Sequence, residues 1–405
     1  MKIKFQLFIA FLIGLSCTLV HAADTDLPRE FKGMSPLQWS IKTANSQMAR
    51  KGPGMSWTEG GRKKWDYADN VFLLGIIKLG QQTQDTKYAK FADGVISSFV
   101  QADGSIRTYN AEDYTLDNIN PGKTLLALYE QNQNDGYRLA AANLRKQLTT
   151  HPRTADGGFW HKKVYPQQMW LDGIYMASPF LAQYGKLFNE PGNFDEVAKQ
   201  IKLIAAHTYS EKTGLFYHGW DSAKQQPWAN KETGLSANFW SRAIGWFAMA
   251  LVDTLDYMPA DHPARPEIIA ILDKTAAGIV KNQDPSGLWW QVTDQPDREG
   301  NYLEATGSAM FVYTLAKGVN KGYLSKDYIA PAIKGYSAIV DKLIKIDGDN
   351  VTLTKCCSVA GLGPGNSRNG SFEYYIHEPI VDNDMKGVGP FVMAGIELQQ
   401  IVNGK

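Results

Sequence analysis

One carboxylate stands among apolar and aromatic residues between positions 156 and 184. Asp172 has Trp170 shortly before it and Ile174 and Tyr175 shortly after it. Such neighbours would exclude water from the carboxyl group, which disfavours its charged form and raises its pKa. A carboxylic acid that keeps its proton near neutral pH can serve as a general acid. A carboxylate that only caps or stabilises a helix is the competing interpretation of Asp172 taken alone.

Two turns carry further groups that could exchange protons or bind an anion. His161 and Lys162 follow the turn 156–158, and His218 follows two aromatic residues in the segment 217–221. A histidine titrates near neutral pH, so it suits proton transfer. A hydrogen-bonded core histidine explains His218 as simply when that residue is taken alone.

A cation and two more carboxylates lie in apolar helical segments. Arg242 must be paired or face a cavity, because an unpaired buried charge is costly. Its guanidinium suits the carboxylate of a uronic acid, and an internal ion pair with Asp253 is the alternative. Asp69 and Asp117 could each cap a helix. If they instead face a second carboxylate, the pKa values of the pair would be split, so that one keeps a proton near neutral pH.

These residues belong to a repeated pattern of turns and helices. Turns with glycine and aromatic residues recur along the chain, and apolar helical segments alternate with amphipathic ones. This alternation predicts a closed ring of helical hairpins, a double α-barrel whose inner layer is apolar. A linear solenoid is the alternative, and a β-sandwich is disfavoured because alternating β-branched runs are scarce. The expected inner segments are 66–79, 116–129, 170–184, 239–255, 302–316 and 386–401, and the amphipathic ones include 36–50 (with Ser35 as N-cap), 195–207, 266–281 and 330–345.

In such a ring, the turns at one end and the starts of the inner helices meet at the mouth of the barrel. Acidic, basic and aromatic side chains would then gather there and suit acid/base chemistry on an anionic sugar. The set is Asp69, Asp117, Asp172, Arg242, Glu304, His161, Lys162, His218 and Trp220.

The N-terminus is typical of a secretory signal. Lys2 and Lys4 precede an apolar run from 5 to 20, and small residues near Ala22 form a cleavage site. We therefore expect a signal peptide over 1–22, one catalytic domain over 23–405, and export to the periplasm or medium. Cys17 is not expected to be lipidated, because Gly14 lies where a large aliphatic residue is needed. No later apolar run is long enough to span a membrane.

Composition excludes several other classes of function. The 405 residues carry a formal net charge of +1, so bulk charge implies no nucleic-acid partner. No C-x-x-C or H-E-x-x-H spacing predicts a zinc site, and the adjacent Cys356 and Cys357 are poorly placed for a disulfide. The glycine-rich segment 361–365 lacks a preceding strand, so it predicts a loop at the rim of the barrel and not a nucleotide site.

Five segments together resemble one enzyme family over nearly the whole chain after the signal. They are 169–177 (MWLDGIYMA), 217–221 (YHGWD), 239–246 (FWSRAIGW), 303–310 (LEATGSAM) and 358–363 (SVAGLG). In this order they are similar to motifs of glycoside hydrolase family 105 and its relative family 88, the unsaturated rhamnogalacturonyl and glucuronyl hydrolases. The resemblance implies a single-domain (α/α)6 barrel.

The resemblance also implies a substrate, a reaction and site residues. The substrate is an oligosaccharide that a polysaccharide lyase has left with a 4,5-unsaturated uronic acid at its non-reducing end. The reaction is hydration of the C4–C5 double bond, with Asp172 as proton donor and Asp117 assisting. No metal or organic cofactor is implied, and a monomer or weak dimer is expected. The positions that match the sugar site are Tyr67, His161, Lys162, Met176, His218, Trp240, Arg242 and Trp246.

Alternatives remain within this class and outside it. Sulfated unsaturated glucuronyl-rhamnose fragments of ulvan and other glucuronate-capped glycans share the same terminal sugar, and the segment 356–366 departs from the commoner form. A polysaccharide lyase on the same barrel would need a longer basic groove. A secreted sugar-binding protein would use the aromatic residues without needing Asp172.

Overall fold

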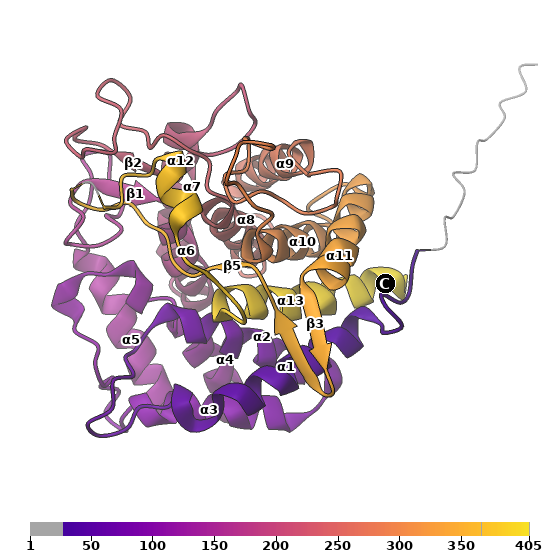
Figure 1. The fold of residues 1–405 in the computed structure, drawn as a ribbon. Coiled ribbons are helices and arrows are strands. Elements are labelled where there is room, and N and C mark those ends of the chain that lie inside the picture. The colour runs from indigo at the N-terminus through magenta and orange to yellow at the C-terminus, as the bar shows by residue number, and fades with distance from the viewer. Residues whose placement is uncertain (1–26, 366, 405) are drawn as a thin grey trace, which may run out of the picture.

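The computed structural model describes residues 27–365 and 367–404. The predicted signal peptide, 1–22, lies outside the described residues. Twelve long helices of the described chain alternate between an inner and an outer layer (Figure 1). The inner helices are α2 (Tyr67–Thr83), α4 (Gly122–Asn132), α6 (Leu171–Leu187), α8 (Ser241–Leu255), α10 (Ala305–Asn320) and α13 (Met385–Val402). The outer helices are α1 (Pro36–Lys51), α3 (Thr86–Phe99), α5 (Asp135–Thr150), α7 (Gly192–Thr208), α9 (Arg265–Lys281) and α11 (Ile329–Lys342).

The inner helices form a closed ring. Each packs on the next in chain order, and α13 packs on α2 to close it, while every outer helix packs on an inner neighbour. The predicted (α/α)6 barrel is confirmed. Among the described residues, no helix combines the length and the apolar character needed to cross a membrane.

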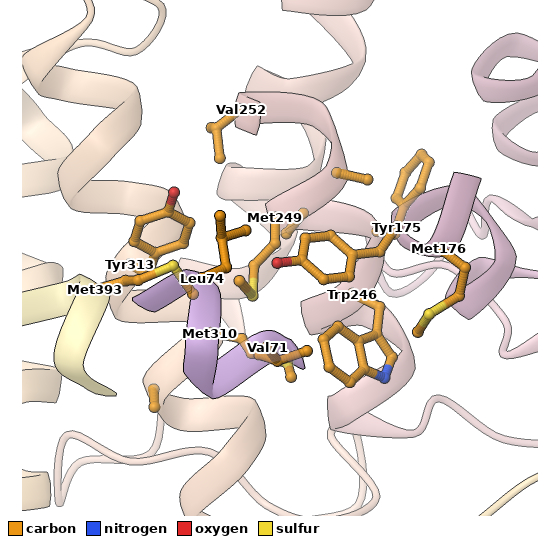
Figure 2. Packing of buried hydrophobic residues seen from close by; sticks show 14 of the residues in the cluster. Val71, Leu74, Tyr175, Met176, Trp246, Met249, Val252, Met310, Tyr313 and Met393 are labelled. Carbon is orange, nitrogen blue, oxygen red and sulfur yellow. The ribbon is translucent and has the colours of Figure 1, made fainter. Parts of the chain in front are cut away.

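Sequence explains where the layers differ. In α8 every residue is buried, because the inner helices contact neighbours on all sides, whereas α3 buries only five residues along one face. The predicted first helix begins as expected: the Ser35 hydroxyl accepts from the backbone of Gln38, whose side chain accepts from the Ser35 amide. Apolar side chains from several inner helices meet at the centre, among them Leu74, Met249, Met310 and Met393 (Figure 2).

Helix ends differ from the predicted bounds by a few residues, and in two segments the chain changes conformation within the predicted range. The segment 116–129 is not one helix: Leu116–Asn118 forms a separate 3-10 turn, η3, and α4 begins only at Gly122. Pro121 accounts for this, since a proline disfavours the helical conformation of the residue before it. The segment 330–345 ends its helix at Lys342, and the chain continues into a strand.

Turns and three short strand pairs lie between the helices, and of these pairs β3–β4 is a hairpin. β1 (Gln168–Trp170) pairs with β2 (Gly219–Asp221), β3 (Ile344–Asp347) with β4 (Asn350–Leu353), and β5 (Cys356–Cys357) with β6 (Ile380–Val381), all antiparallel. The connection from β5 to β6 carries the short helix α12 (Phe372–His377). Figure 1 shows α12 on the same side of the barrel as β1 and β2. The remaining 3-10 turns are η1 (Gly52–Met55), η2 (Ala111–Asp113) and η4 (Lys326–Tyr328).

Candidate active site

Asp172 and His218 are brought together by the antiparallel pairing of β1 with β2, two strands that α6 and α7 separate in sequence. β1 runs directly into α6, so Asp172 lies in the first turn of that helix, and His218 directly precedes β2. The Leu171 amide donates to the His218 carbonyl at 3.0 Å. As a result, Oδ2 of Asp172 lies 3.2 Å from Nε2 of His218, and both side chains are buried.

The direction of the pKa shift at Asp172 corrects the sequence-based prediction. Burial raises the pKa of the carboxyl group, as expected, but the neighbouring His218 and His161 favour the carboxylate, and the net effect lowers the pKa below its ordinary value. Asp172 is therefore ionised in the free protein. The prediction failed because His218 is far from Asp172 in sequence and only the fold makes them neighbours.

Neither atom at this contact has a hydrogen-bond partner among the described residues. Oδ2 of Asp172 and Nε2 of His218 face each other at 3.2 Å without the alignment of a hydrogen bond, and both are buried. Nδ1 of His161 is a third buried polar atom without a partner there. Buried polar atoms are almost always hydrogen-bonded in proteins. These three atoms are therefore free to make hydrogen bonds with a ligand.

Asp117 lies between Lys162 and His161, two side chains that the sequence singled out. Its Oδ2 lies 2.5 Å from Nζ of Lys162, and its Oδ1 lies 3.4 Å from Nε2 of His161. The η3 turn that carries Asp117 is attached to the 161–162 turn, because the Leu116 amide donates to the His161 carbonyl at 3.1 Å. Asp69 instead pairs with Lys63. Each of these two carboxylates therefore has its own cation, contrary to the expected carboxylate pair.

His161 is packed tightly against the start of α6. Its ring stacks on Trp170 at 4.3 Å between centroids, and a side chain at Gly173 would come within 3.2 Å of its Nδ1. Burial lowers the pKa of His161 to about 4, outweighing the attraction of Asp117. His161 is thus neutral at neutral pH. Lys162 has the opposite shift: although burial opposes it, Asp117 raises its pKa above the ordinary value, so Lys162 stays charged.

Arg242 is fixed by backbone carbonyls and not by an internal ion pair. It lies in the first turn of α8, where its guanidinium donates to the carbonyls of Cys357 and Ser358 and stands over the Trp240 ring at 4.7 Å. Its Nε has no partner among the described residues. The alternative pairing with Asp253 is wrong, because Asp253 lies near the other end of α8 and binds Lys317.

Glu304 has a structural role. It caps α10 through the Gly307 amide at 2.6 Å and accepts from the Cys357 amide at 2.9 Å. Both of its oxygens are therefore occupied, and Glu304 fixes the segment whose carbonyls hold Arg242.

Aromatic and apolar side chains from the starts of three inner helices, α2, α6 and α8, surround these groups. Trp246 stacks on Tyr175 at 4.9 Å and meets the edge of Tyr67 at 6.1 Å, as Figure 2 shows for the first pair. Met176 is buried one turn after Asp172 on α6. Trp240, the N-cap of α8, lies 4.9 Å from the His218 ring. The structure thus brings together the ten residues proposed from sequence as catalytic or sugar-binding.

One predicted member of the set lies elsewhere, and one member was missed. Trp220 stacks on His207 of α7 at 3.5 Å, and its indole N–H donates to the Thr233 carbonyl, so it faces away from Asp172. Tyr375 of α12 was missed, although its hydroxyl lies 2.7 Å from Nδ1 of His218. An aromatic pair after a turn was the only signal for it, and nothing in its spacing points to α6.

The predicted rim loop lies beside β1. Leu362 of the 361–365 segment packs with Trp170 and Trp228. In the described part of the chain, no three His, Cys, Asp or Glu side chains are grouped so that they could hold a metal ion.

Comparison with known proteins places the chain among glycoside hydrolases. Residues 39–402 match the model of Glycosyl Hydrolase Family 88. A solved glycoside hydrolase of family 105 from C. acetobutylicum ATCC 824 superposes with a TM-score of 0.85 at 42% identity, covering 89% of this chain and 98% of that one.

Two curated proteins are similar over more than half of the chain. Protein Atu3128 of Agrobacterium fabrum is 38% identical over 229 residues, which cover 55% of this chain and 97% of that protein. The unsaturated rhamnogalacturonyl hydrolase YesR of Bacillus subtilis is 27% identical over 283 residues, covering 68% of this chain and 76% of that protein.

Proposed function

The chain belongs to Glycosyl Hydrolase Family 88, and we propose that it removes a 4,5-unsaturated uronic acid from the non-reducing end of oligosaccharides of the rhamnogalacturonan type. Hydrolase activity on an unsaturated uronic acid follows from its relatives. The aglycone and the origin of the substrate from a lyase are proposed here. The observation that carries the proposal is the buried, unpartnered carboxylate oxygen of Asp172 facing His218 at 3.2 Å.

The proposed reaction is hydration of the double bond. Protonated Asp172 gives its proton to C4, the π electrons form the new C4–H bond, and the positive charge at C5 is shared with the ring oxygen. Water attacks C5 and returns a proton to Asp172, which leaves a hemiketal. Opening of that ring gives a ketone at C5 and a hemiacetal at C1, which releases the aglycone. No carboxylate attacks the anomeric carbon, so the reaction differs from retaining and inverting hydrolysis.

The lowered pKa of Asp172 is compatible with this reaction if the bound substrate raises that pKa again. The uronate carboxylate of a bound sugar is a second negative charge, and a like charge nearby raises the pKa of a carboxyl group. Asp172 would then take up its catalytic proton as substrate binds. Calorimetric titration of the enzyme with an unsaturated uronide, in buffers of different ionisation enthalpy, should show net proton uptake near neutral pH. Binding without proton uptake would contradict this step.

The remaining site residues are proposed to bind and orient the sugar. The rings of Tyr67, Trp240 and Trp246 and the side chain of Met176 offer apolar faces, as sugar-binding sites do. Lys162 and Arg242 supply positive charge for the uronate, and Arg242 still has one free donor, Nε. Asp117, held by Lys162, is proposed to assist Asp172 by orienting the sugar.

Ultraviolet absorbance of the unsaturated uronide tests the activity. Purified protein is added to lyase-digested rhamnogalacturonan I and, in parallel, to lyase-digested ulvan, with Asp172→Asn as the matched control. We expect absorbance to fall in the rhamnogalacturonan digest with the native chain alone. A fall only with ulvan would select the sulfated aglycone, and a rise on undigested polymer would indicate a lyase. Binding without any change would indicate a sugar-binding protein.

Export is proposed from the sequence alone. Residues 1–22 have the charge and apolar pattern of a signal peptide. N-terminal sequencing of the protein recovered from the periplasm should begin at residue 23. Recovery of the full-length chain from the cytoplasm of the native host would contradict it.

A further inference from the structure

Tyr375 connects the rim of the barrel to the catalytic carboxylate. Its hydroxyl lies 2.7 Å from Nδ1 of His218, on the side of the imidazole opposite to Asp172. Both Tyr375 and His218 are 0% exposed. The three side chains therefore form one buried row, from the α12 tyrosine through the histidine to the α6 carboxylate.

For an uncharged His218, elementary hydrogen-bond chemistry decides how the protons lie in this row. A neutral imidazole carries its hydrogen on one nitrogen and a lone pair on the other. If Nδ1 carried the hydrogen, the lone pair on Nε2 would face the ionised Oδ2 of Asp172 at 3.2 Å, which is repulsive. If the Tyr375 hydroxyl donates to Nδ1, Nε2 carries the hydrogen on the side of the ring that faces Asp172. Burial raises the pKa of Tyr375 well above its ordinary value, so the hydroxyl keeps the proton that it donates.

We propose that Tyr375 is a positioning residue, which sets the tautomer of His218 so that Nε2–H faces Asp172. This inference rests on the proposed role of Asp172. It adds a residue outside the family motifs, carried by the 358–384 connection, to the groups that determine the protonation and orientation of the catalytic carboxylate.

Several contacts hold Tyr375 where this role needs it. Its backbone carbonyl accepts from the Gln291 side chain at 3.0 Å, and its ring stacks on Trp240 at 5.8 Å. Ser371 caps α12, and the Gly370 carbonyl accepts from the Asn238 side chain at 2.8 Å. The short helix is thus anchored to the loops before α8 and α10 on both sides of the tyrosine.

The groups that face His218 are few and can be named. Asp172 faces Nε2 and Tyr375 faces Nδ1, while the rings of Trp170 and Trp240 pack against the imidazole. His161 and Tyr67 also interact electrostatically with Asp172. Among the described residues, the Tyr375 hydroxyl is the hydrogen-bond partner of Nδ1, so it is the group that can fix the proton there.

Tyr375→Phe tests the proposal in activity. Loss of one buried hydrogen bond is expected to lower kcat about tenfold while KM changes less than about twofold. Tyr336→Phe is the matched control, because the Tyr336 hydroxyl is also buried but donates to the Pro36 carbonyl between outer helices. That variant should lose thermal stability and keep its kcat. An unchanged kcat in Tyr375→Phe, or an equal loss in Tyr336→Phe, would overturn the proposal.

Nitrogen-15 NMR of histidine-labelled protein tests the tautomer without relying on turnover. In the native chain, at a pH where the imidazole is uncharged, the His218 signal, assigned with His218→Gln, should show a protonated Nε2 and an unprotonated Nδ1. In Tyr375→Phe this pattern should change. A protonated Nδ1 in the native chain, or an unchanged pattern in the variant, would overturn the proposal. The spectrum of the native chain by itself shows which nitrogen of His218 is protonated, so this measurement needs neither a folded variant nor a substrate.

Discussion

Buried charged groups lie near both ends of the inner barrel, and the two ends differ in how completely these groups are paired. Near the C-terminal ends of α8 and α10, Nζ of Lys317 lies 2.5 Å from Oδ1 of Asp253 and 2.5 Å from Oδ2 of Asp256. The Tyr313 hydroxyl donates to Asp253 at 2.6 Å. Lys317 lies beside two carboxylates and Asp253 has two donors, so each charge has an opposite charge next to it, although Oδ1 of Asp256 has no hydrogen-bond partner in the described chain.

At the N-terminal ends of the inner helices, the buried charges are only partly matched. Asp172 faces His218 without a hydrogen bond, and Arg242 has a buried Nε without a partner in the described chain. A buried group that lacks a partner costs free energy, so it is retained where a ligand supplies the missing contact. The pairing of charges, more than their burial, distinguishes the chemical end of the barrel from the structural end.

The largest expected effect is that of Asp172→Asn on turnover. An amide cannot donate the proton that the proposed hydration needs, so kcat should fall about 10³-fold. The free energy of unfolding should not fall by more than about 1 kcal/mol, because the carboxylate has no complete set of partners to lose. Absorbance assays and urea denaturation measure the two quantities. A large loss of stability with little loss of activity would make Asp172 a structural residue and remove the contrast between the ends.

Lys317→Met should have the reverse signature. Removing the cation leaves Asp253 and Asp256 buried without their partner, so the free energy of unfolding should fall by about 3–5 kcal/mol. Turnover per folded molecule should stay within about twofold of the native value. Urea denaturation and active-site-normalised kinetics report these quantities. Loss of kcat in a folded Lys317→Met protein would mean that the two ends are coupled.

Asp117→Asn should have an intermediate effect at the chemical end. The amide cannot hold the charged Lys162 that lies 2.5 Å from the carboxylate, so the sugar should be less well oriented and kcat/KM should fall about 10²-fold. Asp135→Asn is the control, because that residue makes an exposed ion pair with Arg138 on α5, and its kcat/KM should be unchanged. Equal kinetics for Asp117→Asn and the native chain would exclude Asp117 from the site.

Stability is also expected to depend on pH through two buried histidines. Burial lowers the pKa of His151 and His161 to about 4, so between pH 6.5 and 4 the unfolded chain binds protons that the folded chain does not. Stability should therefore fall as pH falls through this window, by up to about 1.4 kcal/mol per pH unit for each histidine.

The paired end should respond to acid later. Burial raises the pKa of the Asp253 carboxyl group, but Lys317 outweighs this and lowers that pKa to about 2. The contribution of Asp253 to stability is therefore present above pH 4 and is lost only as pH falls towards 2.

Urea denaturation across pH 4–6.5 measures the histidine effect. In His161→Gln, the free energy of unfolding should change less steeply with pH than in the native chain. An equal slope would show that His161 is protonated in the folded state.

Much of this arrangement could be predicted from the sequence, and the failures have physical causes. Helix periodicity and capping predicted the two layers, because the inner segments are mainly apolar, the outer ones are amphipathic and Ser35 caps α1. The motif residues come together because they lie in the first turns of inner helices or in the turns beside them. The pKa of Asp172, the partner of Arg242 and the place of Tyr375 could not be predicted, since each depends on segments that meet only in the folded chain. Pro121 was a local signal that the inner segment after Leu116 begins late.

Hydration and direct glycosidic cleavage differ in what happens to the C4–C5 double bond. Proton NMR in D₂O can follow the vinyl proton at C4 of an unsaturated rhamnogalacturonan disaccharide together with release of its rhamnose. We predict that the vinyl signal disappears at the rate of rhamnose release, that one of the two C4 positions gains deuterium stereospecifically, and that Asp172→Asn shows neither change. Accumulation of a free uronate that still carries its vinyl proton would contradict hydration and indicate direct cleavage of the glycosidic bond.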